Sequence, residues 1–128
     1  MVIDTSAIAA IFLKEAERQA FLELIEQDGV RLLSVANALE ATMVLEAKRG
    51  AVVGRELELY LHRLSVEIVP VDYNQIEVAR IGWRKYGKGR HPAGLNFGDC
   101  FAYALTKTSG EPLLAKGDDF RKTDLHCI

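Results

Sequence analysis

The sequence has little cysteine, no long apolar run and no excess of either charge. Its 128 residues include two cysteines, Cys100 and Cys127, and neither has a partner at the spacing typical of zinc sites. This argues against a disulfide framework or a cysteine-based metal centre. No apolar run approaches the roughly 18 residues that a membrane span needs. The net charge of −2 argues against a general nucleic-acid coat protein.

Targeting and linker segments are missing as well. The opening Met1–Asp4 has neither the basic segment nor the long apolar stretch of a signal peptide, and the chain has no repeats or low-complexity regions. A chain of this length suits one domain that buries about two-thirds of its unfolded surface. We therefore expect a single domain, residues 1–128, in a reducing cytoplasm.

Short apolar runs alternate with helical patterns along the chain. Strands are expected at residues 2–3, 30–33, 66–71 and 113–115, with an edge strand from the last residues, and helices at 5–12, 15–26, 34–48, 54–64, 72–83 and 97–108. Residues 86–96 hold three glycines and Pro92, which is typical of a loop. This alternation predicts a parallel α/β sheet covered by helices. Ligands bind at the carboxyl ends of the strands in such sheets.

Acidic residues occur beside the expected strand ends and inside apolar helical stretches, where charge is costly unless it is compensated. They are Asp4, Glu40, Asp99 and the doublet Asp118–Asp119. Because the topology can bring these positions together, the set predicts one shared site. Hard divalent cations, Mg²⁺ or Mn²⁺, are the natural compensators of several converging carboxylates.

Each acid also has a structural interpretation. Asp4 could cap the first helix, although Thr5 or Ser6 could do so instead. Asp99 would interact well with the dipole of the helix that it opens. Residues 116–119 have the composition of a turn, so one acid of the doublet could reach the site while the other caps the turn. The neighbours of Glu40 one turn away are Ala36, Asn37, Met43 and Val44. On this largely apolar face its carboxylate either reaches out to solvent or lines a cavity, and the cavity is favoured.

A basic and aromatic segment precedes Asp99. No acid occurs between Val78 and Gly98, and the segment also contains Trp83, Tyr86 and His91. Its positive charges are Arg80, Arg84, Lys85, Lys88 and Arg90. Such a mixture suits phosphates and unstacked bases, so Arg84, Lys85, Lys88 and Arg90 are predicted RNA contacts. A solvated helix end followed by a flexible loop is the alternative.

Four stretches resemble the PIN-domain ribonucleases, and specifically VapC-type toxins of toxin–antitoxin pairs. The similar stretches are residues 1–7, 38–41, 95–104 and 113–120 with Thr123-Asp124, so the resemblance covers essentially the whole chain. It implies a three-layer α/β/α fold with a short, mostly parallel central sheet. It also implies that Asp4, Glu40 and Asp99 match the first three catalytic acids. The fourth acid often precedes a Phe in this family, which favours Asp119 over Asp118.

The resemblance further implies an RNA substrate, a homodimer and a cognate VapB-type antitoxin whose tail enters the acidic site. The predicted chemistry is Mg²⁺- or Mn²⁺-dependent hydrolysis of RNA phosphodiesters, with Asp4 and Asp99 as main metal ligands and Glu40 and Asp119 acting through water or a second ion. Thr5 or Ser6 could hold a water or a phosphate oxygen.

Other functions account for less of the sequence. A haloacid-dehalogenase-like enzyme would carry a second Asp at position 6, where this chain has Ser6. A receiver domain would have an acidic pair near the first strand. A PIN nuclease of RNA processing without an antitoxin stays open, as does a non-catalytic α/β module that binds a protein.

Overall fold

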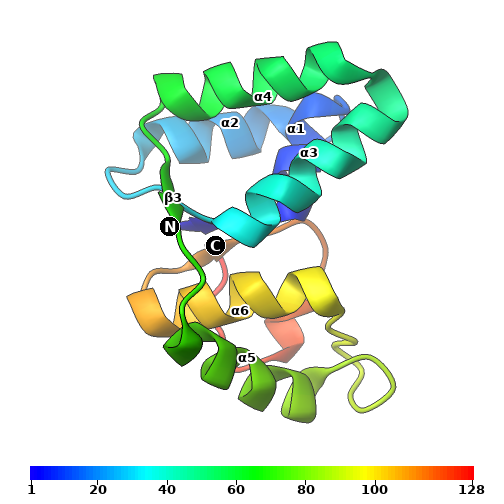
Figure 1. Ribbon diagram of the computed structural model, residues 1–128, viewed down its shortest axis with the longest axis vertical. Helices are drawn as coiled ribbons and strands as arrows, with labels where there is room; N and C mark the ends of the chain where they lie inside the picture. The colour runs from blue at the N-terminus through cyan, green and yellow to red at the C-terminus, as the bar shows by residue number, and fades with distance from the viewer.

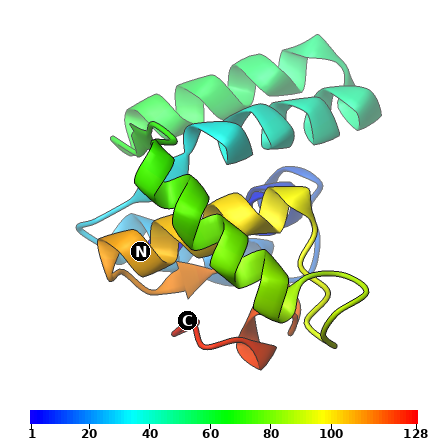
Figure 2. The same cartoon turned by 60° about the horizontal axis from the view of Figure 1, so that its bottom comes forward.

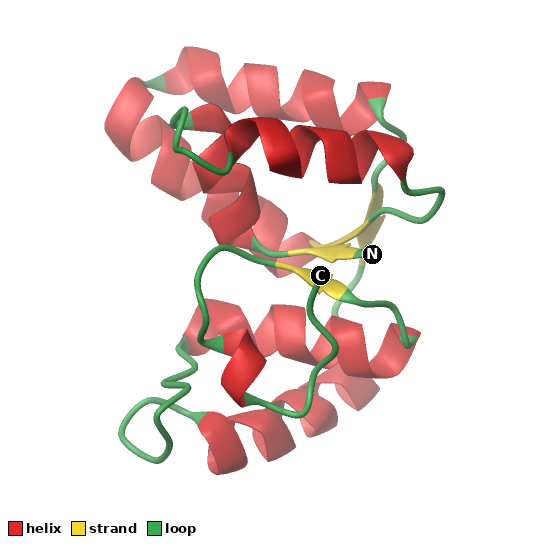
Figure 3. Ribbon diagram, turned by 180° about the vertical axis from the view of Figure 1, so that it is seen from behind, coloured by secondary structure: helices red, strands yellow, loops and turns green.

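A four-stranded parallel sheet lies between two layers of helices (Figures 1 and 3). This computed structural model describes residues 1–128, and its strand order is β3-β2-β1-β4 with every pair parallel. The strands are β1 (Val2–Ile3), β2 (Leu32–Ser34), β3 (Glu67–Val69) and β4 (Leu113–Leu114). The three-layer α/β/α fold expected from the sequence is confirmed.

The helices divide unequally between the two faces of the sheet. One face is covered by α1 (Thr5–Phe12), α2 (Arg18–Gln27), α3 (Val35–Arg49) and α4 (Ala51–Arg63). The other is covered by α5 (Tyr73–Tyr86), α6 (Phe97–Ser109) and the short 3₁₀ helix η1 (Phe120–Lys122). In Figure 2, α5 crosses over α6 and a loop extends from its end. No helix is long and apolar enough to cross a membrane.

Alternating side chains of the strands supply two separate cores. Ile3, Leu33 and Leu114 pack with α1 to α4. Their neighbours Val2, Leu32 and Leu113 pack with α6 and the end of α5. Successive side chains of a strand point to opposite faces, so a sheet covered on both sides needs apolar residues at every position. That requirement explains why β1 and β4 read as apolar runs, whereas β3, at the exposed edge of the sheet, begins with Glu67.

Several boundaries differ from those expected. Helix α2 begins at Arg18 because residues 13–17 form a turn in which Lys14 has a positive φ of 57°. Helix α4 begins directly after Gly50, whose φ of 82° joins it to α3. The expected edge strand at the C-terminus is reduced to one parallel bridge between Leu113 and Cys127.

The strand order brings distant segments to one edge of the sheet. From β1 the chain proceeds to β2 and β3 on one side and later returns to β4 on the other side, so the order reverses between β1 and β4. The Asp4 amide donates to the Leu114 carbonyl at 2.9 Å, which places the two strand ends together. This reversal point is where parallel α/β sheets bind ligands.

The loop between α5 and α6 is pinned by backbone bonds. The Lys88 amide donates to the Leu95 carbonyl, and the Leu95 amide donates to the Tyr86 carbonyl, both at 2.9 Å. The His91 ring lies edge-on to Tyr86, with centroids 5.0 Å apart. The loop therefore delivers its basic residues in a defined arrangement and leads directly into α6.

Candidate acidic site

Asp4 occupies the end of β1 as a buried carboxylate with only 3% of its surface exposed. Its Oδ2 accepts the Ser6 amide at 2.9 Å, so Asp4 itself caps α1, and the expectation that Thr5 or Ser6 frees it from capping was wrong. Its Oδ1 has no hydrogen-bond partner. Burial raises the pKa of Asp4, and the nearby Glu40 carboxylate raises it further. A buried carboxylate with a free oxygen fits a cation.

Glu40 is held on α3 by a neighbour that the sequence interpretation passed over. The amide of Asn37, which is fully buried, donates from Nδ2 to Glu40 Oε1 at 3.3 Å and to the Gly98 carbonyl at 3.0 Å. The Glu40 carboxylate lies directly against Gly98, where a Cβ would be 2.6 Å from Oε1. Asn37 and Gly98 therefore fix Glu40 where α3 meets α6.

Asp99 opens α6 in a capping box with Asn96. The Asn96 side chain accepts the Asp99 amide, and Asp99 Oδ2 accepts the Asn96 amide, both at 2.9 Å. Burial, with the carboxylates of Asp4, Glu40 and Asp119, raises the pKa of Asp99 to about 6, while the hydrogen bond from Asn96 opposes the rise. Asp99 thus responds to three acids that come from different parts of the chain.

The acidic doublet lies in the turn after β4. Asp118 is 86% exposed and lies 4.0 Å from the Arg121 guanidinium. Asp119 is 64% exposed and lies 3.5 Å from the Lys122 ammonium. Only Asp119 contributes to the pKa of Asp99, which favours it as the fourth acid. The choice between the two stays a prediction.

The hydroxyls of Thr5 and Ser6 connect α1 to the segments that carry the other acids. Thr5 Oγ1 donates to the Asn37 carbonyl at 3.4 Å. Ser6 Oγ accepts the Lys116 amide at 2.9 Å and so ties the turn after β4 to α1. Both hydroxyls already have protein partners, and their predicted role in holding a water or phosphate stays a prediction.

The carboxylates do not form a ready-made cage for an ion. No three His, Cys, Asp or Glu side chains are arranged to hold one metal ion. Mg²⁺ commonly keeps several waters and takes only one or two carboxylates directly. The free Oδ1 of Asp4 and the unbonded Oδ1 of Asp99 supply donors of that kind. The residues therefore fit a hydrated hard cation.

The predicted RNA contacts are exposed and lie at the end of α5 and in the loop after it. They are Arg84, Lys85, Lys88 and Arg90. None forms an ion pair with a carboxylate, so their charges remain available. The Arg90 guanidinium lies 4.2 Å from the centroid of the Trp83 ring, and the Lys85 ammonium lies 5.1 Å from that of Tyr86.

Comparisons with known proteins identify the family of the chain. The PIN domain family model matches residues 1–125. This chain belongs to the PIN-domain family, among its VapC ribonucleases. It is 52% identical to "VapC ribonuclease Mb0640" of Mycobacterium bovis over 128 residues, which cover 100% of this chain and 98% of the relative. It is equally similar to "Ribonuclease VapC" of Mycolicibacterium smegmatis, covering 100% of this chain and 99% of the relative.

A solved PIN-domain structure has the same fold. It is "Crystal structure of Mycobacterium tuberculosis VapC20 (Rv2549c), Sarcin-Ricin loop cleaving toxin", with a TM-score of 0.78 and 21% identity over 99% of this chain and 97% of that one. The resemblance inferred from four sequence stretches is therefore confirmed. The assignment as a ribonuclease toxin of the VapC type is confirmed with it.

Proposed function

We propose that this PIN domain is a Mg²⁺- or Mn²⁺-dependent endoribonuclease whose catalytic acids are Asp4, Glu40, Asp99 and Asp119. The observation that carries the proposal is that hydrogen bonds join the four acid-bearing segments: the Asp4 amide donates to the Leu114 carbonyl, Asn37 links Glu40 to the first turn of α6, and the Lys116 amide donates to Ser6. These acids come from the end of β1, from α3, from α6 and from the turn after β4. Uncompensated carboxylates destabilise one another, so their convergence is explained by a cation that they share.

Each residue of the acidic site has a separate proposed role in catalysis. When bound, the cation supplies Lewis-acid activation of water and offsets the charge that develops on the leaving oxygen. Asp4 and Asp99 would hold it directly, while Glu40 and Asp119 would hold its waters or a second ion. Asn37 keeps Glu40 in position for orienting the attacking water. All three histidines lie outside α1, α3, α6 and the turn after β4, so carboxylates are the available proton acceptors.

The test is cleavage of structured and unstructured RNAs by purified, antitoxin-free protein with Mg²⁺, Mn²⁺ or EDTA. We expect cleavage with either cation and none with EDTA. The carboxylates and the RNA phosphate are all negatively charged, so they repel one another unless a cation lies between them. Cleavage that persists in EDTA would contradict the proposed metal dependence. Absence of cleavage in all three conditions, with antitoxin excluded by mass spectrometry, would favour a non-catalytic module.

Removal of the four positive charges should weaken RNA binding. In a variant with Arg84, Lys85, Lys88 and Arg90 changed to Gln, each lost phosphate contact should reduce the salt slope of log K by about 0.7 for single-stranded RNA. Fluorescence anisotropy across a salt series, in EDTA, measures that slope. A matched change of Lys48, Arg49, Arg55 and Arg63 on α3 and α4 keeps the same charge difference and should leave the slope closer to that of the wild type. Equal slopes for the two variants would contradict this RNA path.

The acidic site also fits the tail of a cognate VapB-type antitoxin. A groove of about 460 Å³ between α3 and α6 has Glu40 among its lining residues, and Leu39 and Met43, each 62% exposed, lie along it. Apolar residues of the antitoxin would fill the groove, and a Lys or Arg would reach the carboxylates. A homodimer and a cytoplasmic location complete the proposal.

A further inference from the structure

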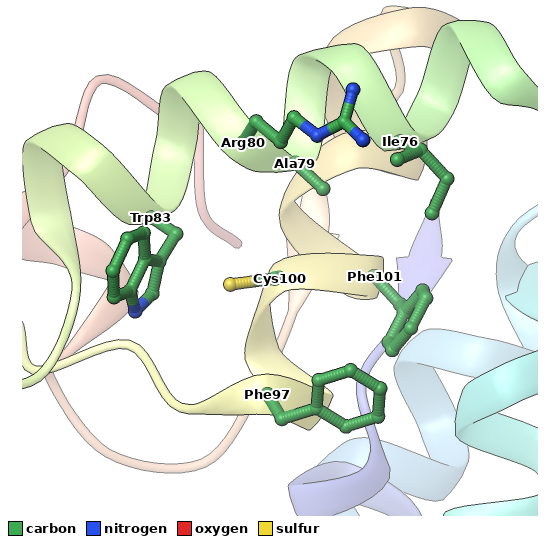
Figure 4. Close-up of a pocket in the computed structure, with 7 residues that line it drawn as sticks. All are labelled: Ile76, Ala79, Arg80, Trp83, Phe97, Cys100 and Phe101. Atoms are coloured by element: carbon green, nitrogen blue, oxygen red, sulfur yellow. The ribbon is translucent and has the colours of Figure 1, made fainter.

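An apolar hollow of about 300 Å³ lies between α5 and the first turns of α6 (Figure 4). We call it the aromatic pocket. Its walls include Trp83 and Arg80 from α5 and Phe97, Cys100 and Phe101 from α6. Phe97 and Cys100 lie in the same turn of α6 as Asp99. Asp99 itself lies two residues from Phe97 and two from Phe101, so its carboxylate faces away from the pocket and the first turn of α6 separates the pocket from the acids.

The aromatic rings of the pocket are unusually accessible. Phe97 is 81% exposed and Trp83 is 42% exposed. Clustered apolar surface of this kind marks an interaction site on soluble proteins. The Phe97 ring is braced edge-on by Phe101, with centroids 4.9 Å apart. The Trp83 indole packs against Gly87, where a Cβ would be 2.8 Å from Nε1. Both rings are thus held in place before a ligand arrives.

Positive charge adjoins these rings. The Arg90 guanidinium lies over Trp83 and has no carboxylate partner. Arg80 lies in the wall and pairs with Glu77, but both side chains are about half exposed, and exposed pairs of this type contribute little stability. Arg80 can therefore exchange Glu77 for a phosphate. Aromatic rings beside the unpaired Arg90 and the exposed, weakly held Arg80 match a nucleotide, which combines a flat base with an anionic backbone.

We propose that the aromatic pocket holds an unpaired base of the RNA, across the first turn of α6 from the acids that cleave the strand. This rests on the proposed function, since it takes the acidic site as the place of cleavage. The volume lies at the lower end of about 300–1,000 Å³ for small-molecule sites, which suits a single base. The chain accordingly selects RNA with an unstacked nucleotide, from a loop or a single strand, over continuous duplex.

Trp83 provides the readout because it is the only tryptophan of the chain. Its fluorescence is titrated in EDTA, without cleavage, with a single-stranded oligoribonucleotide and with an abasic oligomer of the same length and charge. The base-containing oligomer should quench Trp83 and bind roughly tenfold tighter. Equal affinity and equal fluorescence changes with the two oligomers would contradict base binding in the aromatic pocket. An apolar side chain of a protein partner would then be the expected ligand.

Variants at Phe97 separate stacking from folding. Phe97→Ala should weaken binding of the base-containing oligomer roughly tenfold and leave the abasic oligomer unaffected, while Phe97→Tyr should restore binding. Leu59→Ala removes an equally solvent-accessible side chain, 64% exposed, from α4 and should change neither. If Phe97→Ala binds and cleaves as the wild type does, the pocket assignment fails while the nuclease stands. Base-dependent quenching in a protein that cleaves no RNA would keep the pocket and reject the nuclease.

Discussion

Asp99→Asn is expected to abolish RNA cleavage while leaving the fold intact. The amide keeps an oxygen that can accept the Asn96 amide, so the capping box that starts α6 survives. The charge that the site needs is lost, and with it a ligand of the cation. A loss of about 1,000-fold or more, equivalent to roughly 4 kcal/mol of transition-state stabilisation, is expected. Single-turnover cleavage at saturating Mg²⁺, with circular dichroism for the fold, measures both.

The matched control is Asp72→Asn. Asp72 caps α5 by accepting the Gln75 amide at 2.8 Å, as Asp99 accepts the Asn96 amide, but it lies outside the acidic site. Its variant should cleave RNA as the wild type does. A full loss of cleavage in Asp72→Asn, or residual cleavage above a tenth of wild type in Asp99→Asn, would contradict the assigned role of Asp99.

The same variant should change how stability depends on pH without metal. The pKa of Asp99 in the folded protein is about 6, against an ordinary value of 3.8, so the folded state holds this proton more tightly than the unfolded chain. The resulting stability is fully present below pH 3.8 and is lost as the pH rises through 6. Because the carboxyl is partly exposed, we expect a loss of order 1–2 kcal/mol.

Urea unfolding in EDTA between pH 4 and 7 tests this sign. Asp99→Asn should be more stable than the wild type at pH 7, and the difference should shrink towards pH 4. Mg²⁺ should stabilise the wild type at pH 7 more than the variant, because binding to the folded state alone adds stability. A wild type that gains stability from pH 4 to 6 relative to the variant would contradict the raised pKa of Asp99.

The fold could be predicted from the sequence because a parallel sheet covered on both faces leaves a strong pattern of short apolar runs. Runs such as Val2-Ile3 and Leu113-Leu114 need apolar residues facing both layers, and helical periodicity fills the intervals between them. Helix ends were harder to predict, because residues 4–6 offer three capping side chains in a row. The hydrogen bond from the Ser6 amide selects Asp4, and this depends on the direction in which β1 ends.

The sequence could predict that the acid-bearing segments converge, but it could not predict the contacts that hold each acid. The topology rule brings Asp4 and the turn after β4 together whatever the local contacts are. Asn37 was recognised as a helical neighbour of Glu40 but was given no role, because the function of a single amide on an apolar helix face depends on a partner from another helix. The available signal was its spacing of three residues from Glu40, which puts both side chains on one face of α3.

Gly98→Ala should impair cleavage with little effect on stability. The added Cβ would overlap Oε2 of Glu40 and lie 2.6 Å from its Oε1, and the carboxylate, as the end of a flexible side chain, can swing away at low cost. Alanine also favours the helix over glycine by up to about 1 kcal/mol. Displacing Glu40 moves one proposed catalytic acid away from the other three. A misplacement of about 1 Å can reduce the rate roughly 100-fold.

Gly54→Ala is a control in which the added Cβ also meets the carboxylate of a glutamate on α3. Gly54 on α4 lies beneath Glu46 of α3, and its Cβ would be 2.5 Å from Oε1 of that side chain. Glu46 is exposed and outside the acidic site, so its displacement should leave cleavage unchanged. Urea unfolding and single-turnover cleavage of both variants separate the two effects. Equal cleavage by Gly98→Ala and Gly54→Ala would show that the position of Glu40 does not matter for the reaction. A rate loss confined to Gly98→Ala would place the crossing of α3 and α6, with Asn37 bridging it, among the features on which catalysis depends.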